Sequence, residues 1–178
     1  KIVGARYYGA EYGNNISYDH NSPRDTNGHG SHTAGTAAGN HGVAMNIMGN
    51  DMGLGSGMAP AASVAVYKGL WQTADGRGSG TSSGLVAAID DAVADGVDVI
   101  NYSVSGSSEY VVTADEPAVM AAAEGGIFVS TSAGNSGDTV GVFSVAHNSP
   151  WTMTVAASTH DRGVKNTLTT GDGKVYEG

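Results

Sequence analysis

The stretch that decides the fold is "TSSGLVAAIDDAVADGVDVINYSV", residues 81–104. Its first part, residues 81–96, predicts a helix: a Ser or Thr can cap the start, apolar residues recur at helical spacing, and a glycine ends it. The apolar residues at this spacing are Leu85, Val86, Ile89 and Val93. Its second part, residues 97–104, begins almost entirely apolar and predicts a strand.

The same alternation continues on both sides of this stretch. Residues 63–70 predict an earlier strand, residues 116–126 a second helix, and residues 127–134 and 151–158 two further strands. Alternating strands and helices predict an α/β fold with a parallel sheet and right-handed crossovers. The strands are apolar runs, so we expect burial on both faces, and we expect ligands beyond their carboxyl ends.

The remaining segments predict little regular structure. The first 28 residues are rich in polar and turn residues, and we expect them to be irregular. Residues 31–38 are small enough to form a helix that packs closely on a sheet, whereas residues 40–60 and 71–80 predict loops.

Composition narrows the class of protein. The chain has 178 residues, which suits one domain, and its net charge of −9 disfavours nucleic acid and anionic membranes as partners. It has no cysteine, so it has neither disulfides nor thiolate chemistry. No apolar run is long enough to span a membrane, and the first residues lack the layout of a signal peptide.

Two histidines, His29 and His32, stand in the glycine-rich stretch "DTNGHGSHTAGTAAG", residues 25–39. A metal pair, a catalytic base and two structural histidines are the alternatives. The spacing lacks the glutamate of the zinc motif H-E-x-x-H. Glycines on both sides of His29 leave room for a substrate, and a histidine titrates near neutrality, so His29 can act as a general base.

Two further motifs carry possible chemistry. "GTSSG", residues 80–84, matches the G-x-S-x-G elbow of α/β-hydrolases with Ser82 as nucleophile, although the polar loop before it favours a residue at the start of a helix. "STSAGNSG", residues 130–137, follows a strand, so Asn135 can either donate to an oxyanion or simply shape a turn.

Together these motifs resemble the subtilase (subtilisin-like) family of serine peptidases. "NGHGSHTAGTAAG" resembles the family's histidine box, "DGRGSG" its substrate-pairing edge, "GVDVINYSVSG" its second substrate wall, and "STSAGNSG" its oxyanion box. The boxes keep the family's order. "SPRDTNGHGSHTAGTAAG" and "VAASTHDR" look closest to the plant-type, cucumisin-like branch and its secreted bacterial relatives.

The resemblance implies a three-layer subtilisin-like parallel sheet with flanking helices, of which this chain is an incomplete part. It makes His29 the triad base, His32 a supporting histidine and Asn135 the oxyanion donor. The residues that it implies for peptide binding are Ser79, Gly80, Ser103, Val104, Ser105 and Gly134. A peptide held between two edge segments is recognised through its main chain.

Two boxes of the family are missing from these 178 residues. No Asp-Ser/Thr-Gly motif precedes His29: Asp19 lacks the motif, and Asp25 is too near His29 to reach back to its ring. No Gly-Thr-Ser-Met-Ala motif carries a nucleophile. We therefore expect the chain to be the central part of a catalytic domain, inactive alone, with an inserted protease-associated domain to follow.

The resemblance also sets expectations for cofactors and partners. We expect no required cofactor and no catalytic metal. Subtilases often bind structural calcium in the loop at 40–57, but calcium is not favoured here, because the loop holds only one acidic residue, Asp51. Partners would be a peptide or protein substrate and the remaining segments of the domain, and the protein would be secreted. The rival functions are a non-catalytic peptide-binding module and an esterase that uses Ser82.

Overall fold

A three-stranded parallel sheet forms the centre of the chain. The computed structural model describes residues 1–13, 16–106, 112–161, 163 and 165–178. The strands of this sheet are β7 (Val99–Tyr102), β8 (Phe128–Ser132) and β9 (Met153–Val155). Tyr102 pairs with Thr131, and Thr131 with Thr154, so all three strands end near one edge.

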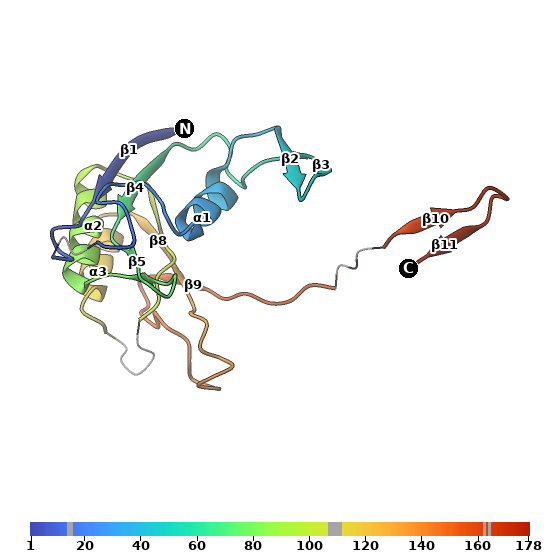
Figure 1. Ribbon diagram of the computed structural model, residues 1–178. Coiled ribbons are helices and arrows are strands. Elements are labelled where there is room, and N and C mark those ends of the chain that lie inside the picture. The colour runs from blue at the N-terminus through green and yellow to red at the C-terminus, as the bar shows by residue number, and fades with distance from the viewer. Residues whose placement is uncertain (14–15, 107–111, 162, 164) are drawn as a thin grey trace.

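Two helices, α2 (Ser82–Ala94) and α3 (Glu116–Glu124), cover one face of this sheet (Figure 1). The core lies between them and the strands. Its buried members are Ile89, Tyr102, Ala118, Val119, Ala122, Ile127 and Val129. Leu85, Val86 and Val93 pack against this cluster, which confirms the predicted helical face. Gly96 and Gly126, each with a positive φ, follow the two helices as the sequence predicts.

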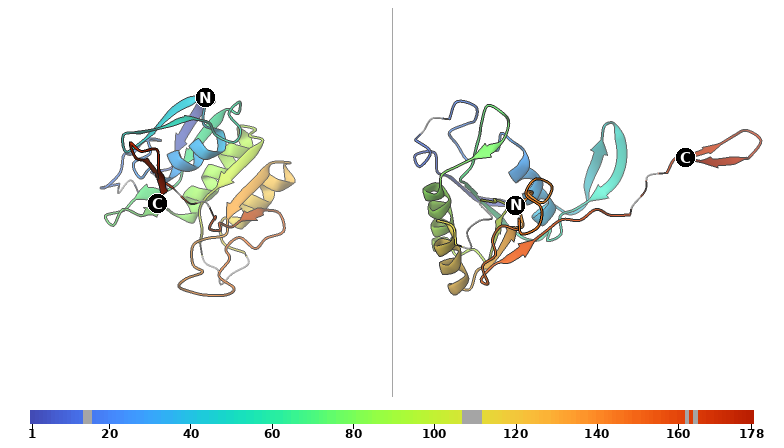
Figure 2. Two further views of the ribbon diagram at one scale, coloured as in Figure 1. Left: turned by 90° about the vertical axis from the view of Figure 1, so that its right-hand side faces the viewer. Right: turned by 90° about the horizontal axis from the view of Figure 1, so that it is seen from below.

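The opposite face of the sheet is covered only in part, by α1 (His29–Ala38) (Figure 2). The three layers are therefore present, but the predicted burial of the strands on both faces is wrong for this chain. Val99 is 58% exposed, Phe128 50% and Met153 54%. One short helix with small side chains cannot cover the outward side chains of three strands.

A separate pair of parallel strands lies beside this sheet. β4 (Val64–Lys68) pairs with β1 (Ile2–Tyr7), from Ile2 opposite Val64 to Tyr7 opposite Lys68. The prediction that the first 28 residues are irregular is therefore wrong for β1. No local turn or periodicity marks this strand, because its partner lies more than fifty residues away in sequence.

Three hairpins stand where the sequence predicted loops or no element. They are β2 (Val43–Ile47) with β3 (Asn50–Gly55), β5 (Trp71–Gln72) with β6 (Gly78–Ser79), and β10 (Thr167–Thr169) with β11 (Val175–Glu177). In the first, Met48 and Gly49 have φ of 51° and 88°, as a two-residue type I′ turn requires. The first and third hairpins project from the helical layers (Figure 1).

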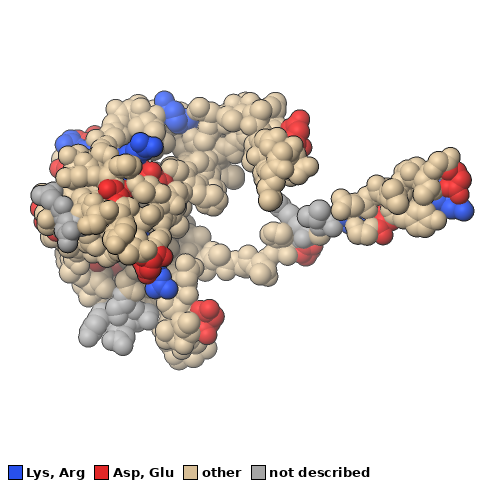
Figure 3. All heavy atoms as spheres, viewed as in Figure 1, with Lys and Arg blue, Asp and Glu red and all other residues tan. Residues whose placement is uncertain are grey.

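Charged side chains are scattered over the face shown in Figure 3, where Lys and Arg do not gather into a patch. Among the described residues, no helix has both the length and the apolar character that crossing a bilayer requires.

Candidate active site

His29 is the first residue of α1, and Gly28 before it is the N-cap of the helix. The Asp25 carboxylate accepts hydrogen bonds from the Gly28 backbone N–H at 2.9 Å and from the Ser31 backbone N–H at 2.8 Å. Gly28 has a φ of 91°, a conformation that glycine adopts without strain. Asp25 therefore anchors the helix start and does not contact the His29 ring, as the sequence predicts.

The Asp25 carboxylate is held in its charged form. Burial acts to raise the pKa of Asp25, but hydrogen bonds from the Ser31 side chain and from backbone amides outweigh it and lower the pKa below its ordinary value. A carboxylate charged over a wide pH range also suits the positive end of the helix dipole.

His32 lies one turn further along α1 and faces the sheet. It lines a cavity of about 280 Å³ between α1 and β7. The other lining residues are Thr33, Thr36, Ala37, Met58 and Asn101. Across this cavity, α1 faces Asn101 near the carboxyl end of β7, at the edge where the sequence predicts a ligand.

The turns after β7 and β8 meet at this same edge. A Cβ atom on Gly134 would lie 3.5 Å from Cβ of Ser105 and 3.7 Å from Cβ of Ala146. Gly134 also has a φ of 84°, so a side chain there would be strained. The structure therefore brings Ser105 and Gly134 into proximity at this edge.

Asn135 follows Gly134 and is exposed. No hydrogen bond of its amide to another residue is found within the described ranges. The structure does not bring it into contact with His29. Asn135 follows β8, which pairs with β7, and α1 faces Asn101 of β7 across a cavity.

Ser79 and Gly80 belong to an edge segment. Ser79 pairs with Trp71 in the two-stranded sheet of β5 and β6, which leaves β6 with an edge that carries no ladder within the described ranges. Gly80 is packed tightly, because a Cβ there would lie 2.3 Å from the Gly69 carbonyl oxygen. Such an edge can pair with an extended peptide.

Asp19, the other acid near the histidine box, forms a buried ion pair with Lys68. Its side chain is 2% exposed and accepts a hydrogen bond from the Lys68 ammonium at 2.8 Å. Burial acts to raise its pKa, but hydrogen bonds from Lys68, Thr26 and two backbone amides lower it to about 2. Asp19 thus ties the N-terminal segment to the end of β4, and it also accepts hydrogen bonds from the backbone N–H groups of His20 and Gln72.

Ser82 is the first residue of α2, where Thr81 is the N-cap and accepts a hydrogen bond from the Gly84 backbone N–H. The short hairpin β5–β6 precedes it, so the strand-to-helix turn of a nucleophile elbow is not formed here. No histidine is hydrogen-bonded to Ser82 in the part of the chain that the structure describes.

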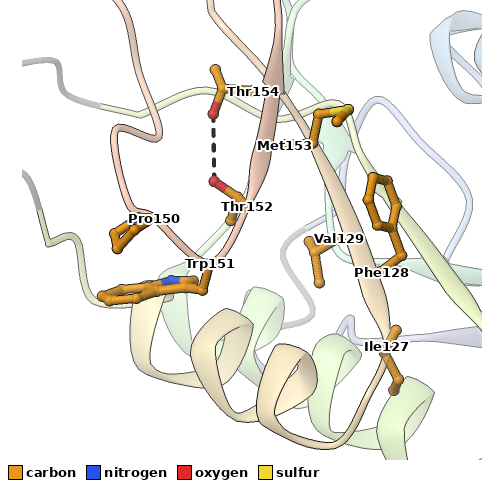
Figure 4. Close-up of a pocket in the computed structure, with 8 residues that line it drawn as sticks. All are labelled: Ile127, Phe128, Val129, Pro150, Trp151, Thr152, Met153 and Thr154. Atoms are coloured by element: carbon orange, nitrogen blue, oxygen red, sulfur yellow. Dashed lines mark hydrogen bonds between the residues drawn. The ribbon is translucent and has the colours of Figure 1, made fainter.

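A larger hollow of about 470 Å³ opens between β8, β9 and the turn before β9 (Figure 4). Its lining consists of Ile127, Phe128, Val129, Pro150, Trp151, Thr152, Met153 and Thr154. None of these side chains titrates, so this hollow offers no acid–base chemistry. Across the described ranges, no three histidine or acidic side chains lie close enough to share a metal ion.

Sequence reasoning missed one buried polar cluster, formed by Glu116, His147 and the Val104 carbonyl. Glu116 and His147 are 1% and 9% exposed, and His147 contacts both Glu116 and the Val104 carbonyl. An acid in the first turn of a helix usually faces solvent, and the histidine sits in an irregular segment. No local signal in either stretch marks them as partners.

Comparison with known proteins identifies the family. The model of the Subtilase family matches residues 5–175. The chain belongs to the subtilase family. The subtilisin-like protease SBT2.5 of Arabidopsis thaliana is 41% identical over 188 residues, which cover 100% of this chain and 22% of that protein. SBT1.5 of the same plant is 42% identical and is matched over 23% of its length.

The solved structure of Sphericase shares the fold of this chain. The match covers 76% of this chain and 41% of the Sphericase chain, with a TM-score of 0.53 and 32% sequence identity. The subtilisin-like fold is therefore confirmed. This subtilase chain spans about a fifth of the length of the plant relatives that it matches.

Replacement of Asp19 in this subtilase chain tests the buried ion pair. In Asp19→Asn, the Lys68 ammonium stays buried without its charge partner, so we expect stability to fall by about 3 kcal/mol in urea unfolding. Asp75→Asn is the matched control. Asp75 pairs with Arg77 where both side chains are more than half exposed, so a change of at most about 0.5 kcal/mol is expected.

The same pair predicts an acid dependence. The pKa of Asp19 falls from 3.8 to about 2 on folding, so its contribution to stability is complete above about pH 4 and is lost as pH falls through 2. The difference in stability between the parent chain and Asp19→Asn should therefore shrink between pH 4 and pH 2. An unchanged difference over this range would contradict the assignment.

Replacement of Asp25 tests the helix start. Asp25→Ala removes acceptors from the backbone amides of Gly28 and Ser31, so we expect a loss of about 1–2 kcal/mol and faster hydrogen exchange at the Ser31 amide. Asp51→Ala, which removes one turn contact to Gly53 in β3, should leave that exchange rate unchanged. Equal rates in both variants would show that Asp25 does not hold the helix start.

Proposed function

We propose that this chain is the central part of the catalytic domain of a serine endopeptidase that cleaves peptide bonds by a Ser-His-Asp mechanism. The observation that carries the proposal is the meeting of Ser105 and Gly134 at the carboxyl edge of the sheet, with the amide of Asn135 next in sequence. Membership of the subtilase family supports it, since the relatives are subtilisin-like proteases.

In this proposal the chain supplies the base and the oxyanion donor. His29 takes the proton from a serine hydroxyl as it attacks the peptide carbonyl, then gives that proton to the leaving amine. Asn135 donates a hydrogen bond to the oxyanion, an interaction worth about 3–4 kcal/mol of the barrier in such sites. The serine and the orienting aspartate come from segments outside these 178 residues.

In this proposal two edge segments of the chain bind the substrate. The peptide extends between β6 with Gly80 on one side and residues 103–105 on the other, and its side chain enters the cleft beside Gly134. Pairing through the main chain permits broad specificity. Structural calcium and other cofactors are not part of the proposal.

The open face of the sheet supports the remainder of the proposal. Parallel sheets are normally covered on both faces, and the half-exposed Val99, Phe128 and Met153 are available for further segments of the domain to cover. We include in the proposal secretion, an inserted protease-associated domain, and a place in the plant-type, cucumisin-like branch or among its bacterial relatives. The identity to Arabidopsis proteases supports the branch.

The catalytic roles are tested in the full-length protein with a peptide substrate. We expect His29→Ala to lower kcat at least about 10³-fold, and Asn135→Ala to lower it about 10²- to 10³-fold with little change in KM. His41→Ala, on an exposed turn before β2, is the histidine control and should be fully active. Full activity of His29→Ala would refute the assignment of the base.

A second experiment separates the rivals. The 178-residue chain alone should bind peptides without cleaving them, because it lacks the nucleophile; cleavage that His29→Ala abolishes would contradict this. In the full-length protein, a fluorophosphonate should label a serine other than Ser82. Labelling of Ser82 favours the esterase, and peptide binding without labelling or turnover favours a non-catalytic module.

A further inference from the structure

Asn27, two residues before His29, connects the start of α1 to the hairpin of β5 and β6. Its side-chain Nδ2 donates a hydrogen bond to the Gly76 carbonyl oxygen at 2.7 Å, across 49 positions of sequence. Its Oδ1 accepts a longer bond from the His29 backbone N–H at 3.4 Å. One planar amide group thus contacts both the proposed base and the turn of the hairpin that is proposed to bind the substrate.

The two contacts fix the orientation of this amide. A carbonyl oxygen only accepts and a backbone N–H only donates, so Nδ2 must face Gly76 and Oδ1 must face His29. The Asn27 backbone is itself held, because its N–H donates to the Asp25 carboxylate at 3.0 Å. The same carboxylate accepts from backbone amides at the start of α1. Asn27 and the first turn of α1 are therefore held by one side chain.

The inner strand of the hairpin, β5, has anchors that do not involve Asn27. The Gln72 backbone N–H donates to the buried Asp19 carboxylate at 2.8 Å, and the Trp71 side chain is only 1% exposed. The Lys68 ammonium lies 4.6 Å from the centre of the Trp71 ring, within the range of a cation–π interaction. Removal of the Asn27 amide therefore leaves β5 attached to the rest of the chain.

The outer strand, β6, is held less firmly. It pairs with β5 over two residues, Ser79 opposite Trp71 and Gly78 opposite Gln72. A two-stranded hairpin of this length has little stability of its own in water. The bond from Asn27 adds a point of attachment at the turn that leads into β6.

The alternation of hydrogen bonds places the backbone groups of Gly78 on the open edge of β6. The Thr73 N–H donates to the Arg77 carbonyl oxygen at 2.9 Å, so these two opposite residues form a hydrogen-bonded pair. Bonded and non-bonded pairs alternate along antiparallel strands, so the next pair, Gln72 with Gly78, is non-bonded. The N–H and C=O of Gly78 therefore face away from β5, where an added strand can pair with them.

The bond between Asn27 and Gly76 fixes a position more than it stabilises the fold. Both residues are exposed, and because water competes for exposed groups, the bond contributes little to the free energy of unfolding. Gly78 on the open edge follows Gly76 by two residues, and His29 follows Asn27 by two residues. Loss of the bond lets the edge move relative to the base while the fold stays intact.

We propose that Asn27 is a positioning residue that sets the distance and register between the peptide-pairing edge at Gly78 and the base His29. A peptide that extends along this edge is thereby aligned with its scissile bond at His29. A peptide too short to reach the edge gains nothing from this alignment. The inference rests on the proposed function for its substrate, an extended peptide.

The test compares two uncharged peptide substrates of the full-length protein that carry either two or four residues before the scissile bond. The readout is the ratio of kcat/KM for the long peptide to kcat/KM for the short one. In Asn27→Ala we expect this ratio to fall at least about fivefold, because the added residues of the long peptide pair with a displaced edge. Asn27→Asp keeps the shape and the acceptor for His29 but cannot donate to Gly76, so a similar fall is expected.

Asn46→Ala is the matched control, because Asn46 accepts a hydrogen bond from the Gly49 backbone N–H in the exposed turn between β2 and β3. Its ratio should stay within about twofold of the parent value, and both alanine variants should have melting temperatures close to that of the parent. A ratio unchanged in Asn27→Ala or Asn27→Asp, or lowered equally in Asn46→Ala, overturns the inference. A large fall in melting temperature confined to Asn27→Ala also overturns it, because the role is then structural.

Hydrogen exchange separates this inference from the proposed function. The Thr73 and Gly76 backbone amides, which are bonded within the turn, should exchange faster in Asn27→Ala than in the parent or in Asn46→Ala. If the full-length parent shows no turnover, the proposed function fails, and these rates alone decide whether Asn27 holds the turn. Faster exchange then supports the positioning role, whereas unchanged exchange overturns it with or without turnover.

Discussion

The parallel pairing of β7 with β8 is the constraint on which the candidate site depends. Because Tyr102 is opposite Thr131, both strands end at one edge, and the turns that follow them must meet there. This pairing makes neighbours of Ser105 and Gly134, and it brings the segment with Asn135 to the same edge of the sheet. A shift of register by one residue would reverse the faces of all these side chains.

Glycine and small residues permit the close approaches at this edge. Gly134 adopts a left-handed conformation beside Ser105, and Gly80 fits against a backbone carbonyl where any side chain would collide. Bulk is instead concentrated on the other face of the sheet, where α2 and α3 bury the core. The apolar core thus lies between the sheet and the helices α2 and α3, whereas small residues gather at the carboxyl edge of the strands.

Two pairs of buried polar side chains join distant segments within the described ranges. Lys68 and Asp19 join the N-terminal segment to the end of β4, and Glu116 and His147 join the start of α3 to the segment before β9. Each pair joins segments that are far apart in sequence. Such pairs lose much of their value when one member is removed, which makes the geometry of the connected segments specific.

The sequence by itself determined the central layers and the local roles. The helical spacing of Leu85, Ile89 and Val93 sufficed for α2, and the glycine-rich context of His29 sufficed to predict an accessible residue at the start of a helix. These features depend on residues within a few positions of one another. The tertiary structure alone decided the pairing of β1 with β4, the open face of the sheet, and the partnership of Glu116 with His147. In both pairings the partner residues lie tens of positions apart in the sequence. The free energy of such contacts depends on packing that no local pattern encodes.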